Sequence, residues 1–175
     1  MFRAAKAADP LITDGRIDEA ARSRKEMFGR AIRNCDQAVL DSLKRLADTG
    51  KKIALVSNAD TMEIADWENS ALAGLFHTAV FSCHAGVVKP EPEIYLIACE
   101  KIGVEPGDCV FVGDGGSDEL IGAADLGMSA IQMTGIISRF WPELVDERRK
   151  GSVCRIREIS ELLQGGYGAE GADDS

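Results

Sequence analysis

The sequence predicts an α/β fold of three layers, a parallel β-sheet with helices on both faces. Short apolar runs alternate with segments whose apolar residues recur at helical spacing, an order typical of parallel sheets with helical crossovers. The two clearest runs, residues 52–56 and 109–112, are almost wholly apolar, as strands buried on both faces usually are. Glycines follow several helical segments, where a left-handed residue commonly ends a helix.

The first half of the chain predicts two helices, a strand and an interrupted helix. A charged helix is expected over residues 18–33, with a narrow apolar stripe. A stronger amphipathic helix begins after Asp36, a favourable N-cap, and ends at Gly50. Residues 52–56 then form a buried strand, and residues 61–76 read as helical with a break in the middle.

The second half continues the alternation. Residues 79–82 are the next expected strand, and Pro92 begins a helix that stops at Gly103, because proline fits a first helical turn and glycine a helix end. After the strand at 109–112 we expect a helix over 118–126, a strand over 129–133, a helix over 141–150, an edge strand over 153–156 and a short helix over 158–164. Residues 165–175 are Gly-rich and acidic, which predicts a disordered tail.

Length and charge narrow the classes of function. A chain of 175 residues is enough for one domain with room for a small attachment. The formal net charge of -9 argues against nucleic-acid binding through a broad basic surface. The sequence has no apolar run long enough to cross a membrane, and its first residues do not resemble a signal peptide. We therefore expect a cytoplasmic protein.

Cysteine and histidine usage agrees with that location. An odd number of cysteines without a secretion signal favours free thiols in a reducing compartment. No two of them have Cys-x-x-Cys spacing, and His77 and His84 are not spaced with them as zinc ligands, so both histidines are assigned to structure or surface. The five cysteines are Cys35, Cys83, Cys99, Cys109 and Cys154.

Two carboxylates follow the strand at 109–112. Asp114 comes directly after Gly113, and Asp118 comes after a glycine turn, where the next helix starts. Open α/β sheets bind ligands at the carboxyl ends of their strands. Carboxylates suit Mg²⁺, and the N–H groups of a glycine turn suit phosphate. The alternative is a plain strand-to-helix turn in which Asp118 only caps the helix.

Two other expected strand ends carry polar residues. Ser57 and Asn58 follow the strand at 52–56, and Lys89 lies ahead of the helix that begins at Pro92. All strand ends of a parallel sheet point to one edge, so these groups can meet the two carboxylates. A cation site, a lysine and a hydroxyl together suit phosphoryl transfer. Taken singly, Ser57 could be a helix cap and Lys89 a surface lysine.

With these residues the chain resembles the Rossmann-like core of the haloacid dehalogenase-like phosphohydrolases. The resemblance covers about residues 36–163. Four segments support the resemblance. Val56-Ser57-Asn58 matches the second family motif, and Lys89 within residues 87–95 matches the third. Gly113-Asp114 with Asp118 matches the fourth, and residues 122–128 match the helix that follows it.

The resemblance implies Mg²⁺-dependent hydrolysis of a small phosphorylated metabolite through an aspartyl-phosphate intermediate. Ser57 and Asn58 would bind the phosphoryl group. Lys89 would stabilise the nucleophile and the phosphate, as a catalytic residue together with Ser57. Asp114 and Asp118 would hold Mg²⁺.

The first family motif, an apolar strand that ends in Asp-x-Asp and supplies the nucleophile, is not found. Residues 11–15 have too short an apolar run, and Asp36 and Asp41 fall in a helical pattern. In the family this strand lies at the centre of the sheet. Residues 1–35 would then be the remnant of a helical cap, residues 36–164 the α/β core, and the chain as written a truncated or inactive member.

Other classes of protein fit less well. A non-catalytic protein of the same fold, binding phosphate, metal or a partner, is the main alternative. A receiver-type signalling domain places its carboxylates first in the chain, whereas here they come last. A dinucleotide site would need glycine where Asp118 stands. Dehalogenase activity is less expected than phosphatase activity, because the dehalogenases of the family work without a metal, whereas the pair Asp114 and Asp118 would suit one.

Overall fold

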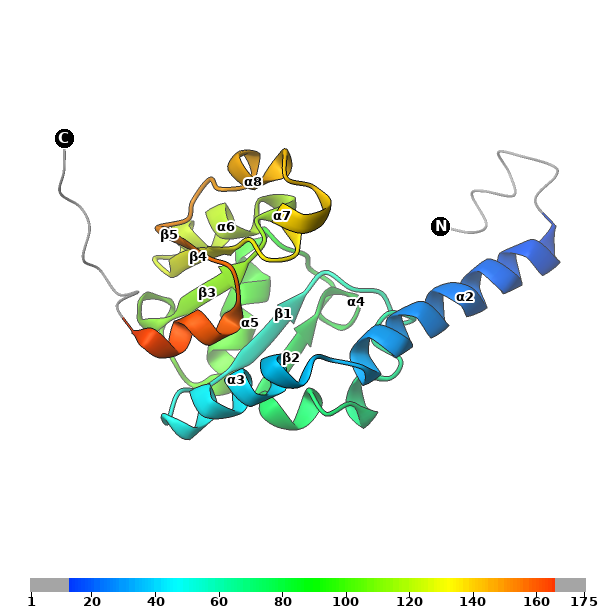
Figure 1. The fold of residues 1–175 in the computed structure, drawn as a ribbon, viewed down its shortest axis with the longest axis horizontal. Coiled ribbons are helices and arrows are strands. Elements are labelled where there is room, and N and C mark those ends of the chain that lie inside the picture. The colour runs from blue at the N-terminus through cyan, green and yellow to red at the C-terminus, as the bar shows by residue number, and fades with distance from the viewer. Residues whose placement is uncertain (1–12, 166–175) are drawn as a thin grey trace.

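The computed structural model describes residues 13–165 (Figure 1). In chain order the helices and strands are α2 (Asp14–Arg33), α3 (Gln37–Asp48), β1 (Ala54–Ser57), β2 (Thr78–Phe81), α4 (Ser82–Ala85), α5 (Pro92–Ile102), β3 (Val110–Gly113), α6 (Glu119–Asp125), β4 (Ser129–Met133), α7 (Ile137–Phe140), α8 (Leu144–Glu147) and β5 (Cys154–Ile156). Short 3₁₀ helices are η1 (Trp67–Asn69), η2 (Ala73–Leu75), η3 (Pro106–Asp108), η4 (Gly116–Asp118) and η5 (Ile159–Gln164).

The strands form two parallel sheets, which confirms the predicted α/β class. One sheet pairs β1 with β2, and the other has the order β3-β4-β5. Within residues 13–165 no strand pairing joins β1 to β3, so the expected single sheet is present as two parts.

Helices cover both sides of the strands. α5 packs against β1 and β2, and α6 packs against β3 and β4, so one apolar core runs beneath both sheets. Ile94 and Leu120, at the centre of this core, are fully buried. On the other side α3 packs against η5, and Figure 1 shows both in front of the strands with α5 behind.

Most of the predicted helices and strands are confirmed, and the residues that cap the helices explain where these begin and end. Asp36 caps α3 by accepting a hydrogen bond from the Ala38 N–H at 2.8 Å. Gly103 ends α5 in the left-handed conformation, with φ 62°. The first helix begins earlier than predicted, at Asp14, because Thr13 provides an N-cap oxygen to the Arg16 N–H.

Two predicted helices were wrong. Residues 61–76 form turns with η1 and η2. Asp60 offers helix-cap bonds to the N–H groups of Met62 and Glu63, but the following turns close through i→i−3 bonds such as Trp67 N–H to the Ile64 carbonyl, and Ser70 is extended, with φ -91° and ψ 154°. Residues 141–150 contain only the short α8, because Trp141 precedes a proline and adopts a non-helical conformation, with φ -144° and ψ 60°.

The predicted tail, apart from Gly165, and the first twelve residues of the predicted cap remnant lie outside the described residues. None of the helices over residues 13–165 combines the length and the hydropathy that a membrane span requires.

Candidate functional site

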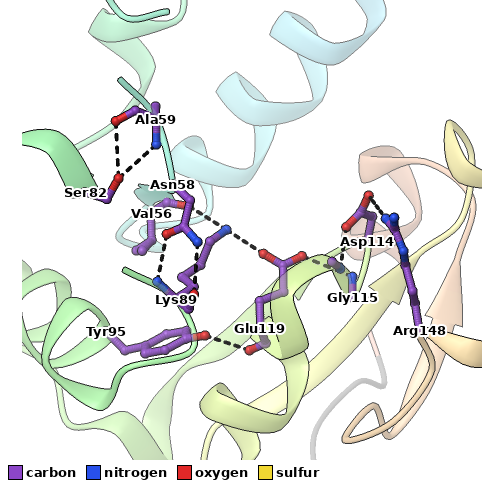
Figure 2. A network of polar contacts seen from close by, with 11 residues as sticks. Val56, Asn58, Ala59, Ser82, Lys89, Tyr95, Asp114, Gly115, Glu119 and Arg148 are labelled. Carbon is purple, nitrogen blue, oxygen red and sulfur yellow. Dashed lines mark hydrogen bonds and ion pairs between the residues drawn. The ribbon is translucent and has the colours of Figure 1, made fainter. Parts of the chain in front are cut away.

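The carboxyl ends of β1 and β3 carry the candidate site (Figure 2). Asn58, one residue past β1, is bound to the backbone of Lys89 in both directions. Its Nδ2 donates to the Lys89 carbonyl at 3.0 Å, and its Oδ1 accepts from the Lys89 N–H at 2.7 Å. The amide thereby fixes the loop ahead of α5, so that Lys89 lies against the end of β1.

The Lys89 ammonium joins the two sheets. Its Nζ donates to Glu119 Oε2 at 2.5 Å and to the Val56 carbonyl of β1 at 3.2 Å. The Phe111 ring on β3 lies 5.8 Å from the same nitrogen. The side chains of Lys89 and Glu119 are only 13% and 7% exposed, so the pair is shielded from water. Lys89 is therefore not the surface lysine of the alternative reading.

Glu119 was not among the residues predicted from the sequence. Besides Lys89 it contacts the glycine turn, since its Oε1 accepts the Gly115 N–H at 3.1 Å. Its backbone carbonyl accepts the Tyr95 hydroxyl at 2.8 Å. The helical pattern contained the signal: Gly122 and Ala123, three and four residues further on, are buried, so a carboxylate at 119 lies on the buried face of α6.

Asp114 is an exposed acid of the site that still has side-chain partners. Its Oδ1 accepts the Gly116 N–H at 2.7 Å, and its Oδ2 pairs with Arg148 at 3.0 Å. Figure 2 shows Asp114 and Glu119 on either side of Gly115. Arg148 gave no signal in the sequence, because it belongs to a charged stretch 34 residues further along the chain.

The two other predicted site residues, Ser57 and Asp118, lack the side-chain contacts that hold Lys89 and Asp114. Ser57 is half-buried at the end of β1, and no hydrogen bond of its hydroxyl to a described residue is seen. Asp118 is exposed in the left-handed conformation, with φ 52°, and as the residue before α6 it makes no side-chain capping bond. Of the two neighbouring acids, Glu119 faces Lys89 and Asp118 does not contact it.

The donor chemistry fits Mg²⁺ in part. Within residues 13–165 no three acidic, histidine or cysteine side chains gather as a metal cage. Mg²⁺ commonly uses only one or two carboxylates and completes its octahedron with water and substrate phosphate. Asp114, whose side chain is half-exposed and forms an ion pair with the partly exposed Arg148, is suited to such a site.

Tyr95 supplies a prediction about stability. It is 1% exposed, and its hydroxyl bonds to the carbonyl of Glu119. Replacing Tyr95 by phenylalanine is expected to lower the free energy of unfolding by about 1–3 kcal/mol, because a buried carbonyl loses its donor. Urea unfolding of both proteins near neutral pH measures the difference. A loss well below this range would show that water replaces the hydroxyl.

The contribution of Tyr95 to the free energy of unfolding should also depend on pH. Burial first, and then the charge of Glu119, raise the pKa of the Tyr95 hydroxyl. A raised pKa in the folded state means that this contribution to stability is complete below the unfolded pKa of about 10 and is lost as the pH rises above it. The gap in stability between the native protein and Tyr95→Phe should therefore narrow in urea titrations above about pH 10. A constant gap would contradict the assignment.

Comparison with known proteins decides the family. A family model described as haloacid dehalogenase-like hydrolase matches residues 3–127. The chain belongs to the haloacid dehalogenase-like hydrolases. Among its relatives in this family is a glyceraldehyde 3-phosphate phosphatase of Methanopyrus kandleri, 28% identical over 130 residues, which are 72% of this chain and 55% of that protein. A pyrophosphatase PpaX of Bacillus pumilus is 31% identical over 126 residues, 71% of this chain and 57% of the relative.

Solved structures agree with this family. A HAD phosphatase from Thermococcus onnurineus superposes with a TM-score of 0.61 and 26% identity, covering 80% of this chain and 62% of that one. A HAD family enzyme from Bacteroides thetaiotaomicron, in complex with magnesium and inorganic phosphate, shares the fold with a TM-score of 0.50 and 24% identity, over 56% of this chain and 53% of that one. The chain spans little more than half the length of the two glyceraldehyde 3-phosphate phosphatases among its curated relatives.

Proposed function

We propose that this chain forms most of the catalytic core of a Mg²⁺-dependent phosphoric monoester hydrolase acting on a small phosphorylated metabolite. The observation that carries the proposal is the position of the Lys89 ammonium, which is held between the Val56 carbonyl and the Glu119 carboxylate where β1 and β3 end. Asp114 and Glu119 both accept N–H groups of the glycine turn that follows β3. Phosphatases among the relatives support the reaction class.

Each residue has a chemical role in this proposal. The Lys89 ammonium neutralises phosphate charge and the charge of the attacking carboxylate. Ser57 offers a hydroxyl to a phosphate oxygen from the end of β1. Asp114 would hold Mg²⁺ together with Asp118, as the sequence suggests. The metal, when bound, neutralises negative charge on the phosphoryl oxygens.

The nucleophile is the part that the described residues do not supply. Among residues 13–165, the only carboxylate in contact with the Lys89 ammonium is Glu119, and both of its oxygens are already hydrogen-bonded. β1 and β3 are not paired to each other. We propose that a parallel strand between them completes the sheet and brings the attacking aspartate to Lys89.

Joining an apolar strand that ends in Asp-x-Asp ahead of residue 1 tests the proposal. The joined protein is expected to hydrolyse 4-nitrophenyl phosphate and glyceraldehyde 3-phosphate with Mg²⁺ and to stop with a chelator, while the chain alone shows no turnover. Changing the first aspartate of the added strand to asparagine should abolish hydrolysis. Equal activity in that variant would overturn the role of the strand. Phosphate binding without any hydrolysis would favour the non-catalytic alternative.

Asp114 gives a prediction specific to the metal. In the active joined protein, Asp114→Asn is expected to lower kcat/KM by at least about a hundredfold, as a lost charge-stabilising group commonly does. The matched control is Asp108→Asn, an exposed acid in η3 just before β3 and so at the opposite end of this strand from Asp114, which should change the rate less than about twofold. Raising the Mg²⁺ concentration should partly rescue Asp114→Asn. A loss that no Mg²⁺ concentration reduces would assign Asp114 to pairing with Arg148 instead.

A further inference from the structure

Two of the five cysteines lie in contact. Cys99 is buried on α5, and Cys109, partly exposed, is the residue directly before β3. Their Sγ atoms are 3.8 Å apart. The loop between them carries η3, and its Glu105 carbonyl also accepts the Cys109 thiol, at 3.3 Å. The thiols of Cys35, Cys83 and Cys154 are free as well, and none of them is described in contact with another thiol.

The position of this thiol pair matters because it spans the two sheets. α5 packs on β1 and β2, whereas Cys109 leads into β3, and no strand pairing joins the two sheets within residues 13–165. The side-chain contacts across this boundary include those of Lys89 and Tyr95 with Glu119. We propose that Cys99 and Cys109 are a disulfide-forming site, which a peroxide oxidises to a covalent link between α5 and β3.

The chemistry balances with hydrogen peroxide as the oxidant. The Cys109 thiolate, the more accessible of the two, attacks one peroxide oxygen and becomes a sulfenic acid while the other oxygen leaves as water. The Cys99 sulfur then displaces the sulfenic hydroxyl, which leaves as a second water, and the S–S bond forms. Each thiol loses one proton and the pair loses two electrons to the peroxide. A thiol reductant reverses the link by exchange.

The surroundings set the speed of this reaction. Burial, and then the nearby Cys99 and Asp108, raise the pKa of the Cys109 thiol to about 11. Few Cys109 side chains are therefore thiolates at neutral pH, and oxidation should accelerate about tenfold per pH unit up to that pKa. The pair would respond to sustained oxidation, unlike a sensor thiol with a low pKa.

Peptide mapping of the native chain tests the site. The chain is treated with hydrogen peroxide, blocked with an alkylating reagent and digested without reductant. We expect a Cys99–Cys109 linked peptide, an intact mass lower by about 2 Da that dithiothreitol restores, and a higher urea midpoint for the linked form. Alkylation of both cysteines after full oxidation, or a link of either one to a different cysteine, would overturn the proposal.

A second variant removes competing thiols. With Cys35, Cys83 and Cys154 changed to serine, only the proposed pair remains, and the same link should form at the same rate within about twofold. Changing Cys109 to serine in that background should abolish the loss of mass. Linked dimers in place of an internal link would contradict the site. If the serine variant does not fold, the map of the native chain decides.

Discussion

Replacing Lys89 by methionine is expected to lower the free energy of unfolding by about 3–5 kcal/mol, because it leaves the Glu119 carboxylate buried without its cation. Glu119 is 7% exposed on its side chain, and its remaining partner is the Gly115 N–H. Since the total stability of a domain is about 5–15 kcal/mol, the variant should lie close to unfolding. Urea unfolding followed by circular dichroism measures the change.

A double variant separates the ion pair from simple loss of packing. Adding Glu119→Gln to Lys89→Met removes the uncompensated charge and keeps an acceptor for Gly115, so part of the lost stability should return. The control is the exposed pair Arg30 and Glu26 on α2, with side chains 69% and 68% exposed, where Glu26→Gln should cost less than about 0.5 kcal/mol. A double variant no more stable than Lys89→Met would show that packing carries the effect.

Replacing Gly115 by alanine is expected to cost about 3 kcal/mol, as the sum of two terms. Gly115 has φ +86°, a conformation that costs an L-residue about 1–2 kcal/mol. A Cβ at this position would also collide with the backbone carbonyl of Arg148, which cannot swing aside as a side chain can. The collision should displace the segment that pairs Arg148 with Asp114.

Gly127 provides the matched control for this substitution. It has nearly the same backbone conformation, with φ +85°, but no atom lies within 4 Å of the position of a Cβ. Gly127→Ala should therefore show only the conformational term, about 1–2 kcal/mol. The difference between the two variants in urea unfolding measures the contact with Arg148. Equal losses would show that the turn relaxes without strain.

The sequence predicted the elements whose signals are local. The capped start of α3 at Asp36, the proline start of α5 and its glycine end all lie within a few residues of the features that cause them. The apolar run of β1 and the polar residues after it could likewise be recognised. The expected burial of this strand on both faces is wrong for the described residues, because all four residues of β1 are only half-buried. The failures at residues 61–76 and 141–150 occurred where 3₁₀ turns with an extended residue, and a proline, interrupt the helical spacing.

The candidate site likewise contains residues that local sequence indicates and contacts that only the packing of the chain decides. Lys89 and Asp114 could be chosen as candidates from the sequence, because each belongs to a recognisable motif after an expected strand. The choice of Glu119 as the partner of Lys89, the use of Asn58 to hold the Lys89 backbone, and the pairing of Arg148 with Asp114 were decided only by the tertiary structure. Each of these contacts joins residues about 30 or more positions apart, and which charge a buried ammonium meets depends on how strands and helices pack, which no local pattern records.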